Sequence, residues 1–281
     1  MSLIDKIKSN RILYSIGKYI NIIYYNYIMD TYDLFKIKLR KSGLLKESNF
    51  EQLRSLKNKY KGKRCFIIAT GPSLTIEDVN LLKNEITIGV NSLVKVLGQI
   101  DYIPTFLGIQ DGNVYQKIGS LIENSDISKI FISDSLYKNQ VKSDKEGRYI
   151  QYPLYNCGHL AHNYEMPLKS GFSGDSNIVV YDGYSVTYSM LQLAVYMGFT
   201  EIYLLGCDCT YDIKGGKQHF VESGHFDKHA DSVGERMIYA YTVASKILKN
   251  KYPNVKVFNA TRGGMLEVFP RKTLDEFDDL K

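Results

Sequence analysis

The sequence predicts an α/β fold, a Rossmann-like and mostly parallel sheet with helices on both faces, preceded by a helical segment. From Lys63 onward, short apolar runs alternate with longer amphipathic stretches, as strands alternate with crossover helices in parallel sheets. The first 60 residues differ, because apolar residues recur there at helical spacing among many basic ones. We therefore expect two parts, a basic amphipathic helical segment over residues 1–60 and a Rossmann-like domain over residues 61–281.

Length and composition fit a globular protein in a reducing compartment. The chain has 281 residues, 44% hydrophobic and 23% charged, which is enough for one sizeable α/β domain with an appendage. Its four cysteines contain no CxxC pair, so neither a disulfide scaffold nor a zinc site is indicated. No apolar run of about 18 residues is present, and charged residues interrupt the N-terminal segment, so we expect neither a spanning helix nor a signal peptide. We expect a cytoplasmic protein.

The positive charge is concentrated at the N-terminus. Residues 1–63 contain 14 Lys+Arg and 5 Asp+Glu, a net charge of +9. The whole chain carries +6, so the remainder carries +6 − 9 = −3. A nucleic-acid-binding domain needs a basic patch on its folded body. The composition indicates none, and we expect no nucleic-acid partner.

The N-terminal segment has an apolar face. The residues that recur at helical spacing are Ile4, Ile7, Leu13, Ile16, Ile20, Ile23 and Tyr27. One interpretation is that this face packs on the main domain or on a second subunit, which would make the protein a homo-oligomer. The other is that residues 1–45 lie on an anionic membrane surface, so that the protein is peripheral on the inner face of the membrane. A break at Lys41–Ser48 predicts a joint before the main domain.

The main domain has six predicted strands and four predicted helices. The strands are Cys65–Ala69, Ile86–Val90, Thr105–Ile109, Lys129–Ile132, Glu201–Leu205 and Val255–Phe258. The helices are Thr75–Lys83, Val114–Glu123, Val186–Met197 and Glu235–Asn250. Ligands of such sheets bind beyond the carboxyl ends of the strands, so the functional residues are sought there.

The loop after the first strand reads Thr-Gly-Pro-Ser-Leu. Gly71 permits close approach of a ligand, and Pro72 stiffens the turn. Thr75 and Asp78 fit a capping box, and amides at such a helix start favour an anion. The sequence contains neither GxGxxG nor GxxxxGK[ST], so neither a nicotinamide dinucleotide nor a P-loop triphosphate is indicated. An ordinary strand–helix turn is the alternative.

Polar residues follow other strands. Asn91 and Asp111 can bind sugar hydroxyls or base edges, but both are also common loop and capping residues. Ser185 and Thr187 begin a long helix, a second place where amides and hydroxyls can meet an anion. Asp208 follows the strand after that helix, where a carboxylate could bind a sugar hydroxyl, orient a base or cap a turn.

Three histidines, His219, His225 and His229, lie within eleven residues. We do not expect a metal site, because the pair spaced by four needs a helix that Gly224 disfavours, and HExxH is absent. A histidine near the strand ends is better suited to act as a general base near neutral pH. Arg262, which precedes two glycines, can bind a phosphate through two hydrogen bonds or belong to a loop that closes the domain.

Together these segments resemble a bacterial and archaeal family described as 6-hydroxymethylpterin pyrophosphokinase-like, found widely among surface-polysaccharide genes. The resemblance covers about Gly62 to Leu280. The matching stretches are TGPSL, IPTFLGIQD, SVTYSMLQLAVYMGFTEIYLLGCD, His219-Phe220 and NATRGGMLEVFPR. More distantly, the Gly-Pro-Ser-Leu loop and the GFTEIYLLGCD block resemble the bacterial sialyltransferases of glycosyltransferase family 42.

The second resemblance implies a domain that binds a CMP-activated sugar without a metal or another cofactor, and the absence of a DxD motif agrees. It implies a histidine general base, for which His219 is the candidate, donor contacts at Gly71, Pro72, Ser73 and Asn91, and a place near the phosphate for Ser185 and Thr187. From their positions in the sequence we further predict Asp208 as a catalytic residue and Leu74, Asp111 and Arg262 as substrate-binding residues. Asp111 departs from the asparagine usual in that family. The stretch after Asp208 does not align cleanly, so the choice of His219 over His225 and His229 stays open.

The sequence thus predicts a glycosyltransferase of bacterial surface-glycan biosynthesis. Its donor would be a nucleotide-activated, CMP-linked and sialic-acid-like sugar, and its acceptor a glycan or glycolipid. One alternative is a Mg²⁺-dependent pyrophosphokinase acting on a pterin-like alcohol, with Asp111 and Asp208 as metal ligands. Another is a non-catalytic nucleotide-binding protein whose N-terminal helix is the partner surface.

Overall fold

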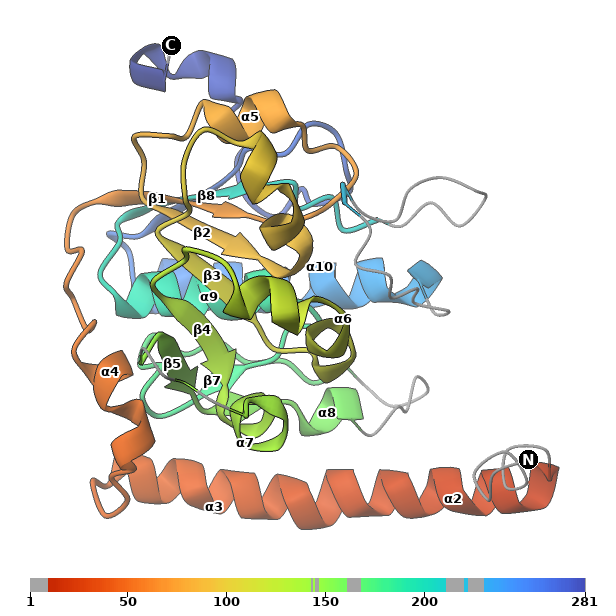
Figure 1. Ribbon diagram of the computed structural model, residues 1–281. Coiled ribbons are helices and arrows are strands. Elements are labelled where there is room, and N and C mark those ends of the chain that lie inside the picture. The colour runs from red at the N-terminus through yellow and green to blue at the C-terminus, as the bar shows by residue number, and fades with distance from the viewer. Residues whose placement is uncertain are drawn as a thin grey trace. The chain divides into compact units, whose positions relative to one another are not determined.

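The computed structural model describes residues 10–142, 144, 147–160, 168–210, 220–221 and 230–280 (Figure 1). The chain divides into two compact units, a smaller one of residues 1–46 and 155–169 and a larger one of residues 47–154 and 170–281. The division falls within the predicted joint. It lies earlier than the boundary expected at residue 60, because Phe50 and Leu53 are buried in the core of the larger unit.

The larger unit is built on a parallel sheet of seven strands, which confirms the predicted α/β class. The strand order is β5-β4-β3-β2-β1-β8-β9. The strands are β1 (Arg64–Ile68), β2 (Thr87–Val90), β3 (Phe106–Ile109), β4 (Ile130–Ser133), β5 (Tyr149–Tyr152), β8 (Glu201–Leu205) and β9 (Lys256–Asn259). Successive strands β2 to β5 extend to one side of β1, and β8 and β9 to the other. The two short strands β6 (Leu154–Tyr155) and β7 (Val180–Tyr181) lie outside this sheet.

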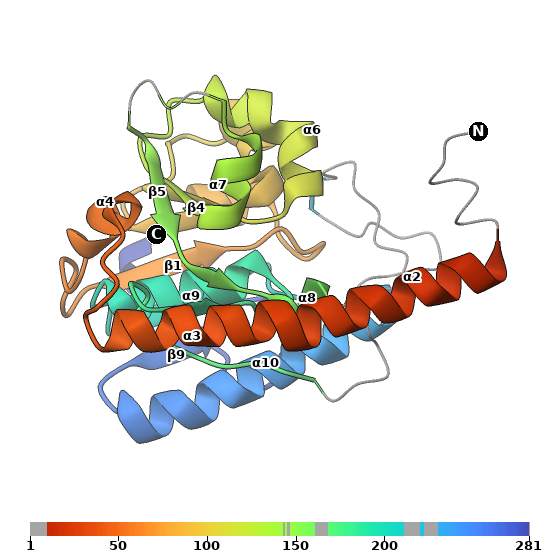
Figure 2. The ribbon, with the colours of Figure 1, turned by 90° about the horizontal axis from the view of Figure 1, so that it is seen from below.

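Helices cover both faces of the sheet, as expected (Figures 1 and 2). The helices α9 (Val186–Tyr196) and α10 (Ala230–Lys251) lie on one face, and α5 (Ile76–Asn80), α6 (Gly112–Glu123) and α7 (Asp134–Gln140) on the other. The remaining elements of this unit are α4 (Glu51–Arg54) and the 3₁₀-helices η2 (Ser48–Phe50), η3 (Asn91–Gln99), η4 (Leu274–Glu276) and η5 (Asp278–Leu280). Successive side chains of β1 point to opposite faces of the sheet and enter the hydrophobic core on each face. Ile67 packs in the cluster that contains α9, whereas Phe66 and Ile68 pack in the cluster that contains α5.

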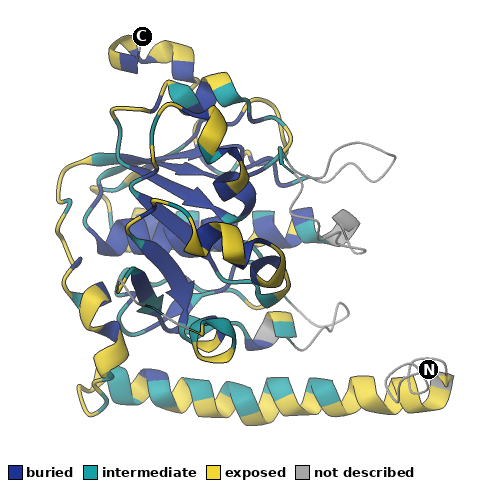
Figure 3. Ribbon diagram, viewed as in Figure 1, coloured by how far each residue is buried: buried dark blue, intermediate teal, exposed yellow. Residues whose placement is uncertain are grey.

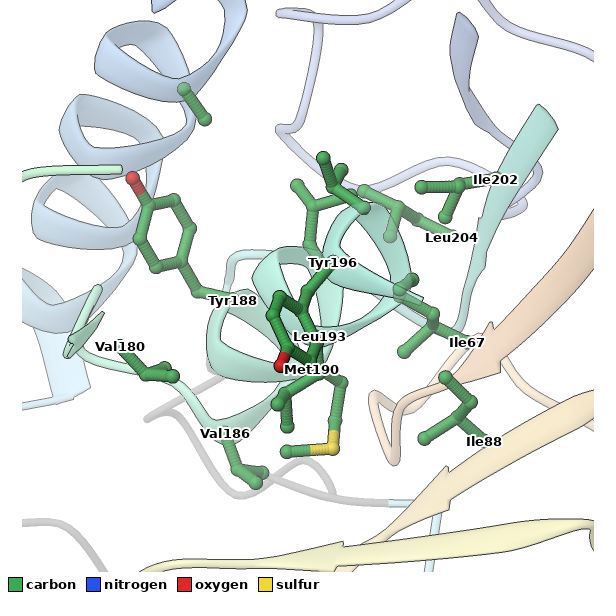
Figure 4. Packing of buried hydrophobic residues seen from close by; sticks show 14 of the residues in the cluster. Ile67, Ile88, Val180, Val186, Tyr188, Met190, Leu193, Tyr196, Ile202 and Leu204 are labelled. Atoms are coloured by element: carbon green, nitrogen blue, oxygen red, sulfur yellow. The ribbon is translucent and has the colours of Figure 1, made fainter. Parts of the chain in front are cut away.

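All of α9 is buried (Figure 4). Its Met190 and Leu193 belong to the same core cluster as Ile67 and Ile88 of the sheet. Its polar Gln192 accepts hydrogen bonds from the backbone N–H groups of Ser173 and Tyr181 and donates to Tyr181 O, so burial leaves this amide satisfied. The helix is therefore a fixed part of the core.

The smaller unit is mainly a long helix formed by α2 (Arg11–Ile23), a π-helical turn η1 (Tyr24–Met29) and α3 (Asp30–Lys41), together with α8 (Cys157–Leu160). Asp30 accepts a hydrogen bond from Tyr155 and pairs with Lys169 (3.5 Å), and Asp33 accepts from Cys157 Sγ (3.2 Å). Burial raises the pKa of Asp33 despite that hydrogen bond. Within the part of the chain that the structure describes, every helix is too short or too polar to cross a membrane.

Candidate functional site

A pocket lies at the carboxyl edge of the sheet, where the strand order reverses. Its lining comes from the loops after β1, β2 and β8, from the start of α9 and from Met237 of α10. Its volume is about 460 Å³ with the space open to solvent included. Parallel α/β sheets bind ligands at such a switch point. The pocket therefore has the position of a ligand site.

The loop after β1 contacts the loop after β8 closely. The N–H of Gly71 donates to Gly206 O (2.8 Å), and Ser73 Oγ donates to Asp208 Oδ2 (2.9 Å). A Cβ added at Gly71 would lie 2.0 Å from Asp208 Oδ2 and 2.5 Å from Gly206 O. Glycine is thus required at position 71 because any side chain would occupy the space of the Asp208 carboxylate.

Asp208 is buried, and it is the acidic residue among the described residues that line the pocket. Burial raises the pKa of its carboxyl, while hydrogen bonds from the hydroxyl and backbone N–H of Ser73 oppose the shift. On the other side, Met265 N–H donates to Asp208 O (2.7 Å), and Gly264 has φ +72°. A raised pKa in a pocket is typical of groups that transfer protons or bind substrate hydroxyls.

The pocket concentrates unusual backbone conformations and one unpaired acceptor. Asn91 (φ +47°), Cys209 (φ +51°) and Gly206 (φ +64°) all line it, and Tyr184 (φ +63°) precedes the lining residue Ser185. The Oδ1 atom of Asn91 is buried and has no hydrogen-bond partner among the described residues. Strained backbone and unsatisfied polar atoms in native structures concentrate at functional sites. Among the described residues, Asn91 Oδ1 is therefore a buried acceptor without a partner on a residue that lines the pocket.

The start of α9 forms another wall. Ser185 caps the helix, since its Oγ accepts from Thr187 N–H (3.2 Å). Ser185, Val186 and Thr187 all line the pocket. A helix N-terminus carries partial positive charge and amide donors, so this wall favours an anionic group such as a phosphate.

Residues 220–221 lie at the same carboxyl edge of the sheet. The N–H of Phe220 donates to Thr70 O (2.8 Å), and Ser92 Oγ donates to Val221 O (2.7 Å). Thr70 lines the pocket, and Ser92 follows the lining residue Asn91. Phe220 follows His219 in the sequence. The three histidines 219, 225 and 229, among which the general base was sought, lie outside the described residues.

The structure brings together five of the residues singled out in the sequence, because Gly71, Asn91, Ser185, Thr187 and Asp208 all line this pocket. Ser73 does not line it but contacts Asp208. Pro72 is also outside the lining, and Leu74 is buried in the core cluster on the α5 face of the sheet.

Two predicted phosphate or sugar contacts have other partners. Asp111 caps α6 by accepting from Asn113 N–H (2.6 Å) and Val114 N–H (3.1 Å). Arg262 pairs with Asp78, whose other carboxylate oxygen accepts from Thr75 N–H (3.1 Å) in the predicted capping box. Neither lines the pocket. Arg262 therefore ties the C-terminal loop to α5 in this structure.

Other lining residues had no sequence signal of their own. Cys207, Cys209 and Thr210 follow β8, and Met237 reaches the pocket from α10. The hydrogen bond with Cys207 raises the pKa of the Cys209 thiol, and burial raises it further. Within the described ranges, with their gaps at 211–219 and 222–229, no group of three or more His, Cys, Asp or Glu side chains could hold a metal ion.

Comparison with known families now adds to this geometry. The family model described as 6-hydroxymethylpterin diphosphokinase MptE-like matches residues 44–214. The chain belongs to the MptE-like family. The matched range contains every lining residue of the pocket except Met237, so the site is largely a feature of the part that matches the MptE-like model.

One solved structure, that of MAf glycosyltransferase from Magnetospirillum magneticum AMB-1, is similar to this MptE-like chain at 16% identity with a TM-score of 0.49. The similarity covers 82% of this chain and 38% of that one, so the chain spans well under half the length of that protein. No curated protein matches the chain.

Proposed function

We propose that this MptE-like protein is a glycosyltransferase that uses a nucleotide-activated sugar, with a CMP-linked, sialic-acid-like donor as the first candidate. The observation that carries the proposal is the pocket at the switch point of the sheet. In the part of the chain that the structure describes, its walls offer a helix N-terminus, an amide oxygen without a hydrogen-bond partner and one buried carboxylate. These groups suit, in turn, a phosphate, a base or sugar donor, and a sugar hydroxyl or a proton in transfer. The resemblance to glycosyltransferase family 42 supports this choice, because it implies nucleotide contacts at Gly71, Asn91, Ser185 and Thr187.

The proposed reaction is displacement at the anomeric carbon of the donor sugar. The acceptor oxygen forms the new glycosidic bond as the bond to the phosphate oxygen breaks, and the nucleotide leaves with that electron pair. The amides and hydroxyls at the start of α9 stabilise the negative charge of the departing phosphate. A general base takes the proton of the acceptor hydroxyl, and Asp208 binds or orients the reacting groups.

Nucleotide binding can be tested by thermal shift with CMP, UDP, GDP and ATP, each with Mg²⁺ and with EDTA. We expect CMP to raise the melting temperature in EDTA, because the α9 wall supplies the phosphate contacts from the protein itself. A protein in which none of the nucleotides changes the melting temperature would contradict the proposal. Asn91→Ala tests the pocket directly, since loss of its buried oxygen should weaken binding of the stabilising nucleotide about tenfold.

The family description favours a second candidate, a Mg²⁺-dependent diphosphokinase that acts on a pterin-like alcohol. That activity would use Asp111 and Asp208 as metal ligands. Of these two carboxylates only Asp208 lines the pocket, while Asp111 caps α6. The same panel separates the candidates, because stabilisation by ATP only in the presence of Mg²⁺ would favour the diphosphokinase.

His219 is our proposed general base. It precedes Phe220, whose N–H donates to the pocket residue Thr70, and the His-Phe pair belongs to the resemblance with the MptE-like family. His219→Ala should lower transfer by about 100-fold or more while nucleotide binding stays near wild type. His225→Ala and His229→Ala are the matched controls, to be compared in steady-state transfer assays. Full turnover in His219→Ala would reject this role, and loss in one of the other two would reassign it.

A further inference from the structure

The long N-terminal helix exposes an apolar stripe, which we define as Ile12, Ile16, Tyr19, Ile20, Ile23 and Tyr27. Each of these residues is 50–72% exposed. Figure 3 shows this helix mainly in the colours of exposed and intermediate residues. Apart from the adjacent pair Tyr19 and Ile20, neighbours in this set are three or four residues apart, which places the set on one face of the helix. In the larger unit, by contrast, the exposed large apolar side chains come from separate elements, namely Leu81, Ile103, Leu121, Tyr239 and Met265. Single exposed apolar residues are ordinary, whereas a contiguous row indicates a binding surface.

The N-terminal segment carries many more basic than acidic residues. Residues 10–46 contain seven Lys+Arg and two Asp+Glu, a net charge of 7 − 2 = +5. Both acids, Asp30 and Asp33, are engaged within the smaller unit by Tyr155, Lys169 and Cys157. The exposed charges are basic, from Lys18, Lys38, Lys41 and Lys46. Of these, Lys18 lies within the span of the stripe, whereas Lys38, Lys41 and Lys46 lie beyond its C-terminal end. The exposed charge of residues 10–46 as a whole is therefore positive.

This arrangement matches an anionic lipid surface. An interfacial helix inserts an apolar face at the boundary of the acyl chains while its lysines reach the headgroups. Tyrosine supports this reading, because its ring is apolar and its hydroxyl remains hydrated at the interface. A second copy of the chain would instead bring two positive surfaces together, which is unfavourable.

We propose that the helix Arg11–Lys41 binds the protein peripherally to an anionic membrane. The apolar stripe enters the lipid interface, and the exposed lysines bind lipid phosphates. This inference goes beyond the proposed function, since it concerns no residue of the pocket. Such binding would hold the nucleotide pocket at a surface where lipid-linked acceptors reside.

The test is sedimentation of the full chain with vesicles of phosphatidylcholine alone or mixed with phosphatidylglycerol. We expect binding to the anionic vesicles that weakens as salt rises, with little binding to the neutral ones. Ile16→Asp/Ile20→Asp should reduce the vesicle affinity more than tenfold, because two charged groups would enter the apolar interface. Lys38→Gln/Lys41→Gln should reduce it about fivefold for each charge removed.

Matched controls use exposed residues of the larger unit. Leu121→Asp places a carboxylate at an exposed apolar position, and Lys249→Gln/Lys251→Gln removes two exposed positive charges. Both variants should bind vesicles like wild type. Circular dichroism checks that the helix content of every variant is unchanged. A wild-type chain that stays in the supernatant when anionic vesicles sediment would overturn the proposal. So would an oligomer, measured by light scattering, that Ile16→Asp/Ile20→Asp converts to a monomer, because a second copy would then cover the stripe. The vesicles contain no nucleotide or acceptor, so the outcome is independent of the nucleotide panel.

Discussion

Replacing Asp208 with asparagine is expected to lower turnover by about 100-fold or more and to leave the protein at least as stable as wild type at neutral pH. The substitution keeps the size of the side chain and an oxygen that can accept from Ser73. It removes the ability to carry a negative charge or exchange a proton. Steady-state assays and urea unfolding measure the two effects separately.

The pH dependence follows from the raised pKa of Asp208, which burial causes. The folded protein holds this proton more tightly than the unfolded chain does. Its stabilising contribution is therefore complete below the unfolded pKa and is lost as the pH rises through the folded pKa. Above the folded pKa the buried carboxylate is charged and costs stability, and asparagine avoids this cost. The stability difference between the variant and wild type should thus shrink as the pH is lowered.

Asp126→Asn, at an exposed carboxylate outside the pocket, is the control and should match wild type in turnover. A loss of stability comparable to the loss of turnover in Asp208→Asn would show that the carboxylate mainly supports the fold. Ser73→Ala adds a further check. The Ser73 hydroxyl lowers the pKa of Asp208, so its removal should raise that pKa and shift the acid limb of the pH–rate profile to higher pH.

Gly71→Ala should destabilise the larger unit by about 1–3 kcal/mol and abolish nucleotide binding. The new Cβ would lie 2.0 Å from Asp208 Oδ2, which could rotate away, but also 2.5 Å from Gly206 O, which belongs to the backbone. That oxygen accepts the N–H of Gly71 itself, so relief of the clash must separate the two loops that form the pocket. Chemical unfolding and thermal shift with CMP would measure both consequences.

Gly98→Ala is the matched control for this change. Gly98 lies in η3, and nothing comes within 4 Å of a Cβ placed there. Alanine should therefore be neutral or stabilising at position 98, by up to about 1 kcal/mol. Equal effects at positions 71 and 98 would show that a general loss of backbone freedom, and not the contact with Gly206, determines the result.

Periodicity was sufficient to predict most of the sheet. The predicted bounds of β8 are the observed ones; β2 and β3 differ from the structure by one residue at the N-terminal end, and β1, β4 and β9 by one residue at both ends. Strand β5 (Tyr149–Tyr152) was missed. It is an edge strand beside β4, so it carries tyrosines and a glutamine in place of the continuous apolar run of a central strand.

The site was predictable where it depends on topology. Carboxyl ends of parallel strands meet at one edge, so the sequence alone places Asn91 and Asp208 at the same edge. Arg262 could not be placed, because its pairing with Asp78 joins residues far apart in the sequence. Cys209 lines the pocket through a positive φ angle that a cysteine rarely adopts, and no sequence pattern predicts it.

The complete enclosure of α9 has a consequence for binding. A helix surrounded by side chains on every side cannot shift without disrupting the core around it. The dipole and amides at its first turn are therefore oriented before any phosphate arrives, and little reorganisation is needed when negative charge develops. This edge of the sheet acts as a rigid template, and any closure that accompanies binding must come from the loops opposite it.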